Sequence, residues 1–245
     1  MKNLVFDIET IPDLDFGRKH LNLDGLSDED VGKSMFFQQH QRNGSEFLPY
    51  DLHQIIAVSI LIDDSENLSI QSYNVDGSYN EKSILIDLFK LFEESDALIS
   101  WNGKMFDLPV LNCRSLKNLT KNSLLKYPNI DFIKHIDLKD ILSNHNIRNI
   151  SSLDTIAKGL NLPGKKLSSG SEVWGLYLDG NINEITDYCT IDVLNTYLVY
   201  THFEFITGTL SENDFDKKNT TLKQYLKSLD NEALNTFAME MNTSD

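Results

Sequence analysis

The chain has 245 residues, of which 40% are hydrophobic and 24% are charged, a composition typical of a globular protein with one large domain or two small ones. Its 22 Lys and Arg against 37 Asp and Glu give a formal net charge of −15, which argues against a protein that coats nucleic acid through a basic surface. A nucleic-acid enzyme is not excluded, because carboxylates that hold divalent cations invert the local charge.

Cysteine usage and hydropathy indicate the compartment. Cys113 and Cys189 lie far apart without CxxC spacing, which excludes a disulfide scaffold and a zinc ribbon and favours a reducing environment. The N-terminus reaches Asp7 and Glu9 before the apolar segment of a signal peptide could form. No apolar run approaches the roughly 18 residues that span a membrane. We therefore expect a soluble, cytoplasmic protein without a membrane partner; the oligomeric state is not determined by the sequence.

The first third of the chain predicts strands interrupted by an insertion. Residues 3–8 form a short, largely apolar run that predicts a strand. Residues 11–52 are polar, contain several Gly and Pro and lack a sustained period, so we expect a functional or mobile insertion in which residues 28–41 could form a short helix. Residues 54–61 and 68–73 are apolar or alternating runs around a polar 63–67, which predicts a β-hairpin.

Helices and strands then alternate. Helical spacing is found at 83–92, near 106, at 152–160 and at 184–206, and strand-like runs at 97–100 and 133–136. This order predicts an α/β domain with a mixed sheet. We place the domain at residues 1–208 and expect 209–245 to be a C-terminal extension, with one amphipathic segment at 222–237 and a frayed end.

Two carboxylates, Asp7 and Glu9, stand at the end of the first strand. Their spacing of two directs both side chains to one face of the sheet. Neighbouring carboxylates repel unless a cation lies between them, and oxygen ligands suit Mg²⁺ or Mn²⁺. A solvated turn is the alternative for so short a motif, although the apolar run before it favours a functional role.

A second motif, Ser100–Pro109, leaves a strand and enters a helix. Asp107 then lies near a helix N-terminus, where backbone dipoles favour a carboxylate; an ordinary helix-start acid is the alternative. Trp101 and Phe106 are either core aromatics or, with Asn102, contacts for a terminal nucleotide.

A third motif places Tyr188 and Asp192 four residues apart on the last long helix. At that spacing a phenol and a carboxylate share one helical face. An exposed pair on an amphipathic helix is the alternative. The order of the three motifs favours function, because two strand ends and one helix can bring four carboxylates to one point.

These motifs resemble those of the DEDD 3′-to-5′ exonucleases of ribonuclease H-like (DnaQ-like) fold, tyrosine subtype. Phe6–Thr10 is similar to the first motif, Asn102-x3-Phe106-Asp107 to the second and Tyr188-x3-Asp192 to the third. Position 187 is Asp, so the His-x4-Asp spacing of the histidine subtype is absent. The resemblance extends from Phe6 to about Gly208. It is to the predicted bacterial exonucleases related to the proofreading domain of family-B DNA polymerases, and it is carried by the stretches 6–13, 135–138, 162–166 and 188–197.

The resemblance implies a ribonuclease H-like α/β fold with a mixed five-stranded sheet flanked by helices. It implies that Asp7, Glu9, Asp107 and Asp192 hold two divalent metal ions, Mg²⁺ or Mn²⁺, and that Tyr188 orients the attacking water. It further implies that Thr10 and Ile11 contact the terminal nucleotide and that Asn102 and Phe106 position the strand. With no room for polymerase domains after Asp192, we expect a free-standing nuclease or a nuclease subunit that releases 5′-mononucleotides.

Two weaker signals remain open. Residues 159–166 approach a phosphate-binding loop, but Lys166 stands where that loop needs Ser or Thr; Lys165 and Lys166 are either rim contacts for substrate phosphates or solvated lysines. His135 and Asp137 either ligate metal or finish a strand and hydrogen-bond neighbours.

The resemblance favours single-stranded DNA as the substrate, by analogy with proofreading domains. A ribonuclease or an enzyme for very short oligonucleotides is the alternative, and scarce basic residues suit a short substrate. A catalytically silent nucleic-acid-binding module is a third possibility, against which all five chemical positions are present.

Overall fold

The protein is described by a computed structural model that covers residues 1–65, 67–75, 79–125, 134–164 and 171–241. Five strands form one sheet in the order β3-β2-β1-β4-β5. The strands are β1 (Asn3–Pro12), β2 (His53–Asp63), β3 (Leu68–Asn74), β4 (Ala97–Ser100) and β5 (Lys134–Asp137). The helices are α1 (Leu14–His20), α2 (Asp28–Asn43), α3 (Glu81–Glu93), α4 (Asp107–Asn118), α5 (Leu138–Leu142), α6 (Leu153–Gly159), α7 (Ser171–Leu178), α8 (Ile182–Ile206), α9 (Glu212–Lys227) and α10 (Glu232–Glu240), with short 3-10 turns at Tyr50–Leu52, Ser123–Leu125 and Ile147–Asn149.

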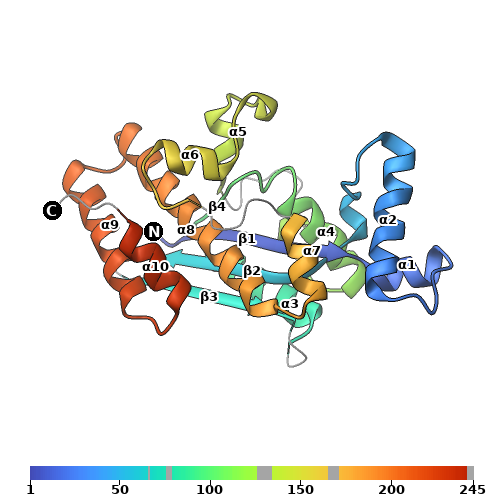
Figure 1. Ribbon diagram of the computed structural model, residues 1–245. Coiled ribbons are helices and arrows are strands. Elements are labelled where there is room, and N and C mark those ends of the chain that lie inside the picture. The colour runs from blue at the N-terminus through green and yellow to red at the C-terminus, as the bar shows by residue number, and fades with distance from the viewer. Residues whose placement is uncertain (66, 76–78, 126–133, 165–170, 242–245) are drawn as a thin grey trace.

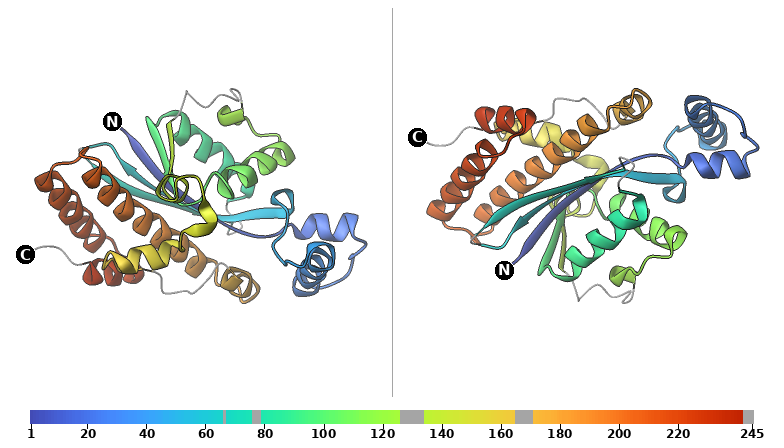
Figure 2. Two further views of the ribbon diagram at one scale, coloured as in Figure 1. Left: turned by 90° about the horizontal axis from the view of Figure 1, so that it is seen from above. Right: turned by 90° about the horizontal axis from the view of Figure 1, so that it is seen from below.

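The sheet is mixed and lies between two layers of helices. β2 pairs antiparallel with β1 and β3, whereas β4 pairs parallel with β1 and β5. Helices α3 and α4 cover one face, and α8 with α9 and α10 covers the other (Figure 2). The predicted hairpin and the predicted α/β fold with a mixed five-stranded sheet flanked by helices are confirmed.

Alternation along β1 assigns its side chains to the two faces. Leu4, Phe6 and Ile8 are buried in a cluster with α3 and α4, whereas Val5 belongs to the cluster on the α8 face. The period of two places Asp7 and Glu9 on the same face as Val5. The strand thus directs Leu4, Phe6 and Ile8 toward α3 and α4, and it directs Val5 and the two acids toward α8.

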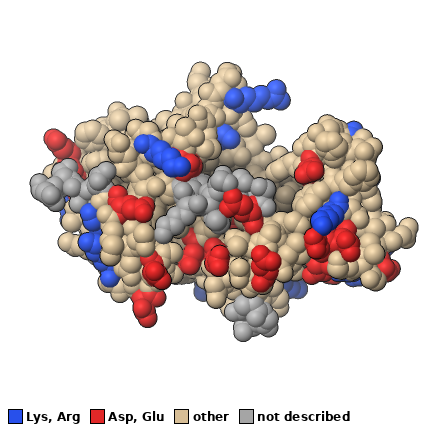
Figure 3. All heavy atoms as spheres, in the orientation of Figure 1, with Lys and Arg blue, Asp and Glu red and all other residues tan. Residues whose placement is uncertain are grey.

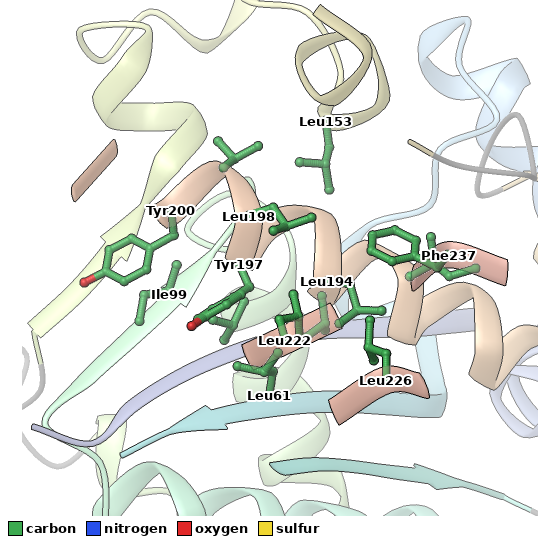
Figure 4. Packing of buried hydrophobic residues seen from close by; sticks show 14 of the residues in the cluster. Leu61, Ile99, Leu153, Leu194, Tyr197, Leu198, Tyr200, Leu222, Leu226 and Phe237 are labelled. Carbon is green, nitrogen blue, oxygen red and sulfur yellow. The ribbon is translucent and has the colours of Figure 1, made fainter. Parts of the chain in front are cut away.

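The α8 face holds the largest described core cluster, centred on Leu194, Tyr197 and Leu198 of α8 (Figure 4). The C-terminal extension contributes to it through Leu222 and Phe237. The single segment predicted at 222–237 is wrong: the chain forms two helices, α9 and α10, that start at the capping residues Ser211 and Asn231.

The insertion contains the short helix predicted at 28–41, which the structure shows as α2, but its bounds and its first helix, α1, differ from the sequence prediction. β1 continues to Pro12 and β2 begins at His53, so the region between the strands is residues 13–52. It forms α1 and α2, which lie beyond the end of β1 (Figure 1). Gly17 permits their close approach, because an added Cβ would lie 2.7 Å from Val31 and 2.9 Å from Met35. Both of these side chains are buried in a core cluster shared with β1, β2, α7 and α8.

The sequence did not predict α5 and α7. Both are short, and a helix of five to eight residues gives little room for a hydrophobic period to repeat.

Among the described helices, none has the length and apolar content needed to cross a membrane.

Candidate active site

Asp7 and Glu9 lie on β1 on the face that α8 covers. Glu9 is buried, and a β-bulge shifts the register with β2 between Glu9 and Thr10. Bulges of this kind re-aim side chains beside active sites. Ligand atoms of Asp7, Glu9 and Cys189 lie within 4.8 Å of one another. The Cys189 thiol donates to the Asp7 carbonyl oxygen at 3.3 Å and approaches Oδ2 at 3.6 Å, so α8 is held directly against the acids of β1.

Asp107 is the first residue of α4 and reaches back to β1. β4 pairs with β1 only along Asn3–Val5, and beyond that point the Ile8 N–H donates to Asp107 Oδ1 at 3.2 Å. The side chain is 3% exposed. Burial, together with the nearby carboxylates of Asp137 and Asp192, raises the pKa of Asp107 to about 7. A bound cation would stabilise the ionised form of Asp107, so this site is suited to a metal ion.

Tyr188 and Asp192 lie on α8, and both are buried. Tyr188 packs in the cluster that includes the insertion and α7. Asp192 is close enough to influence the ionisation of Asp107 and Cys189. The structure therefore brings Asp7, Glu9, Asp107 and Asp192 together from β1, α4 and α8, with Tyr188 one helical turn before Asp192.

The donor set fits hard divalent cations. Carboxylate oxygens are the preferred ligands of Mg²⁺ and Mn²⁺, and burial together with the charges of Asp137 and Asp192 makes the ionised form of Asp107 costly unless a cation is bound. Burial raises the pKa of the Cys189 thiol well above its usual value, with Asp7 and Glu9 adding to the effect. Cys189 is thus a neutral hydrogen-bond donor to Asp7.

The loop that leads into α4 is fixed by β5. Both carboxylate oxygens of Asp137 accept backbone hydrogen bonds, from Asn102 N–H and Lys104 N–H at 2.9 Å each and from Asp140 N–H at 3.3 Å. His135 Nε2 lies 2.9 Å from Ser100 Oγ, which accepts from Gly103 N–H. Of the two roles open for His135 and Asp137, hydrogen bonding to neighbours is confirmed.

This loop leaves no room for a side chain at Gly103, because an added Cβ would lie 2.3 Å from Ser100 Oγ. Asn102 has a φ of 70°, in the left-handed region that asparagine tolerates. Its Oδ1 is buried and accepts no hydrogen bond within the described part of the chain. Such an oxygen needs a donor, and a bound molecule could supply one.

A pocket of about 720 Å³ opens beside Glu9. Thr10, Ile11, Asn102 and Phe106 line it, as their predicted contact with a terminal nucleotide requires. Trp101 does not line the pocket. It is partly buried and packs against the core cluster on the α8 face, as expected if Trp101 is a core aromatic. Lys165 and Lys166 lie outside the described residues.

The sequence missed several residues that complete this pocket. His53 is 8% exposed, and its ring bridges Thr10 Oγ1 at 2.8 Å and the Leu48 carbonyl oxygen at 3.1 Å. Phe47 and Trp174 also line the pocket. Cys189 does not line the pocket but lies beside Asp7 and Glu9; it stands within the third motif and could have been found there. No local signal marks Phe47 or Trp174, because neither belongs to a motif.

A buried ionic cluster fixes the base of the insertion. Arg114 of α4 is 2% exposed and donates to Asp13 at 2.5 Å and to Glu81 at 2.5 and 2.6 Å. Asp13 caps α1 by accepting from Phe16 N–H at 3.0 Å, and its own N–H donates to the Leu52 carbonyl oxygen. The two ends of the insertion are therefore tied to each other and to α4.

A model of the family described as "Predicted 3′-5′ exonuclease related to the exonuclease domain of PolB" matches residues 45–241, well over half of the chain. The chain belongs to this family. Membership identifies it as a hydrolytic nuclease of the 3′-to-5′ exonuclease class. The matched range contains Asp107, Tyr188 and Asp192 and begins after Asp7 and Glu9. A comparison with curated protein sequences finds no significant match.

Comparison with solved structures finds one with the same fold and a second with a weaker match. The family B DNA polymerase from the hyperthermophilic archaeon Pyrobaculum calidifontis matches with a TM-score of 0.54 and 15% identity over 99% of this chain. The match covers 27% of the polymerase, so the chain spans about a quarter of its length. The zinc-bound E. coli ExoI–ssDNA complex matches with a TM-score of 0.47 and 12% identity, over 93% of this chain and 45% of that protein.

Proposed function

We propose that this protein is a metal-dependent 3′-to-5′ exonuclease that shortens single-stranded nucleic acid, with DNA favoured, and releases 5′-mononucleotides. The observation that carries the proposal is the convergence of four carboxylates and one phenol beside a pocket of about 720 Å³. Family membership gives the reaction class, and the relationship to the exonuclease domain of PolB favours DNA.

Asp7, Glu9, Asp107 and Asp192 would hold two divalent ions, Mg²⁺ or Mn²⁺. Such ions, when bound, activate the attacking water and stabilise the leaving 3′ oxygen. The four side chains are held by different elements, and Asp107 is additionally oriented by the Ile8 N–H. This fixed arrangement means that little reorganisation is needed when charge develops on the scissile phosphate.

Tyr188 would position the attacking water through its hydroxyl group. A phenol with an ordinary pKa near 10 is a poor base at neutral pH, so its contribution is orientation. Its burial in the cluster with α7 and the insertion fixes the ring. Asn102 Oδ1 would accept a hydrogen bond from the terminal nucleotide, and Phe106, Thr10 and Ile11 would form the wall against which that nucleotide lies.

Among the described residues, the scarcity of basic side chains around the pocket supports a second candidate, an exonuclease for very short oligonucleotides. Lys33 is the one Lys or Arg among the described residues that line the pocket. The sugar is not specified by any described contact, so DNA and RNA are compared directly in the experiment.

The test is a time course on 5′-labelled single-stranded DNA and RNA of matched sequence with Mg²⁺ or Mn²⁺. Asp7→Ala is compared with the native protein, and Asp24→Ala, at an exposed loop position, serves as the matched control. We expect a ladder that shortens from the 3′ end, survives in Asp24→Ala and disappears in Asp7→Ala. Absence of metal-dependent shortening for every substrate, down to dinucleotides, would favour the silent binding module.

A further inference from the structure

A pocket of about 580 Å³, which we name the α9 pocket, lies between the start of β1 and the C-terminal extension. The end of β2 and the last turns of α8 form its other walls. No described residue of the insertion or of α7 lines it, and none of the four motif carboxylates does. Its polar lining includes Asn3, Asp63, Tyr197, Glu204, Lys217 and Lys218.

Two buried carboxylates in this pocket share one ammonium group. Asp63 is 5% exposed and Glu204 is 7% exposed. Lys218 Nζ lies 2.7 Å from Asp63 Oδ2 but 3.5 Å from Glu204 Oε2. The other cations of the described pocket lining, Lys217 and the amino group of Met1, are exposed. A second cation inside the pocket would therefore offset negative charge that Lys218 offsets only in part.

Asn3 supplies a buried acceptor without a donor. It lies opposite Asp63 in the pairing of β1 with β2, so the two side chains share the face toward α8. Asn3 is 6% exposed, and its Nδ2 group donates to Tyr200 Oη at 3.5 Å. Its Oδ1 accepts no hydrogen bond within the described part of the chain. Because such an oxygen costs free energy until a donor reaches it, Asn3 indicates a bound donor group.

Two neighbouring phenols indicate the same excess of negative charge. Tyr197 donates to Asp63 Oδ2 at 3.1 Å. Burial and the charge of Asp63 raise the pKa of the Tyr197 hydroxyl, and burial and Glu204 raise the pKa of the Tyr200 hydroxyl. Figure 4 shows both hydroxyl groups directed the same way from α8. An anion would be repelled here, whereas a cation would be attracted.

The size of the pocket and the place of Lys218 favour an organic cation over a metal ion. A bare divalent ion would have to displace the Lys218 ammonium group, which already contacts both carboxylates. A pocket of about 580 Å³ admits a molecule with several non-hydrogen atoms.

We propose that the α9 pocket binds a small organic cation with N–H donors, an amine or a guanidinium compound, whose charged group reaches Glu204 and Asn3 Oδ1. Bound there, the cation ties the C-terminal extension to the start of β1, because Lys218 belongs to α9. This inference goes beyond the proposed exonuclease and does not depend on it.

The test titrates 1,4-diaminobutane and 4-aminobutylguanidine into the full chain by isothermal titration calorimetry, with uncharged 1,4-butanediol as the reference compound. Saturating Mg²⁺ and about 150 mM salt are present, so that exposed charges are screened. We expect one equivalent of either cation to bind with a Kd below about 1 mM. Either cation should also raise the melting temperature as its concentration rises, whereas 1,4-butanediol should not bind.

Two variants and two matched controls locate the site. Asn3→Leu should weaken binding by about 10- to 150-fold, the effect of losing one hydrogen bond to a charged group. Glu204→Gln should weaken it by about tenfold, because a charge-assisted hydrogen bond becomes a neutral one. Asn213→Leu and Glu212→Gln, at exposed positions of α9 outside the pocket lining, should bind as the native protein does. Glu204→Gln keeps the shape of the side chain, so it preserves the test if Asn3→Leu fails to fold.

The controls are needed because the chain carries a net charge of −15. The face shown in Figure 3 has acidic groups scattered among separate basic residues in its described part. A cation attracted by net charge alone would therefore bind at many places, and Glu212→Gln would weaken its binding as much as Glu204→Gln.

Each other outcome has one meaning. Absence of binding by both cations, more than one equivalent bound, equal loss in Glu212→Gln or native binding by either folded pocket variant would overturn the inference. Loss of binding in Asp7→Ala would assign the cation to the motif carboxylates and overturn it as well. Since no substrate is present, a protein that binds the cation as expected but never cleaves nucleic acid would support the α9 pocket and overturn only the exonuclease.

Discussion

Replacement of Arg114 by Met should destabilise the protein strongly. Arg114 is buried between Asp13 and Glu81, and Glu81 also accepts hydrogen bonds from Ile55 N–H and Asn118. Without the guanidinium group, the buried Glu81 loses its described ion-pair partner, and the buried Asp13 keeps only its ion pair with Lys117. Removing one partner of a buried ion pair costs about 3–5 kcal/mol of unfolding free energy. For a chain of this size the melting temperature should fall by about 6–20 °C.

The loss should depend on pH. Burial raises the pKa of Asp13, but hydrogen bonds from Lys117 and Arg114 more than offset this and hold it below its usual value of 3.8. A lowered pKa in the folded protein stabilises it above the unfolded pKa, and this stabilisation disappears as the pH falls through the folded value. The difference between native protein and Arg114→Met should therefore be full above about pH 5 and should shrink toward pH 3.

Urea denaturation followed by circular dichroism measures the effect, with Arg148→Met, at an exposed position, as the control. Glu81→Gln in the Arg114→Met background should recover part of the stability, because it removes one uncompensated charge. A loss below about 1 kcal/mol, as for a surface ion pair, would refute the reasoning. Failure of Glu81→Gln to recover any stability would assign the loss to packing.

Three further substitutions test the site. Asp107→Asn should lower kcat/KM by more than about 100-fold. It should also raise the melting temperature of the metal-free protein, with a larger gain at pH 8 than at pH 5, because the cost of the buried carboxylate grows as the pH rises from the unfolded pKa of 3.8 to the folded pKa of about 7. An equal gain at both pH values in calorimetry would contradict this. Tyr188→Phe should lower kcat by about 100-fold with KM unchanged, and single-turnover assays with near-native rates would exclude the positioning role. Asp137→Ala should raise KM by about tenfold or more, because the Asn102 and Lys104 N–H groups lose their acceptor. A native KM in steady-state kinetics would show that the loop before α4 keeps its conformation without Asp137. Asp24→Asn serves as the exposed control for the acidic positions.

The sequence by itself determined the elements whose pattern is local. Strand and helix periods gave the sheet strands, the hairpin and the long last helix, because burial of one face imposes a repeat that is visible along the chain. The motifs at Asp7, Asp107 and Asp192 predicted the convergence of carboxylates, because the end of β1, the loop after β4 and one face of α8 can meet at one edge of the sheet.

The tertiary structure decided what depends on contacts between distant segments. The sequence indicated a short helix at 28–41, but it did not predict α1 or the packing of the insertion. Val31 and Met35 of α2 pack against Gly17 and join a core shared with α7 and α8. Trp101 faces the α8 core, whereas Phe47 and Trp174 line the pocket. A side chain's exposure depends on which distant surface covers it, so the residues that form the pocket became known only when β1, the insertion and α7 were brought together.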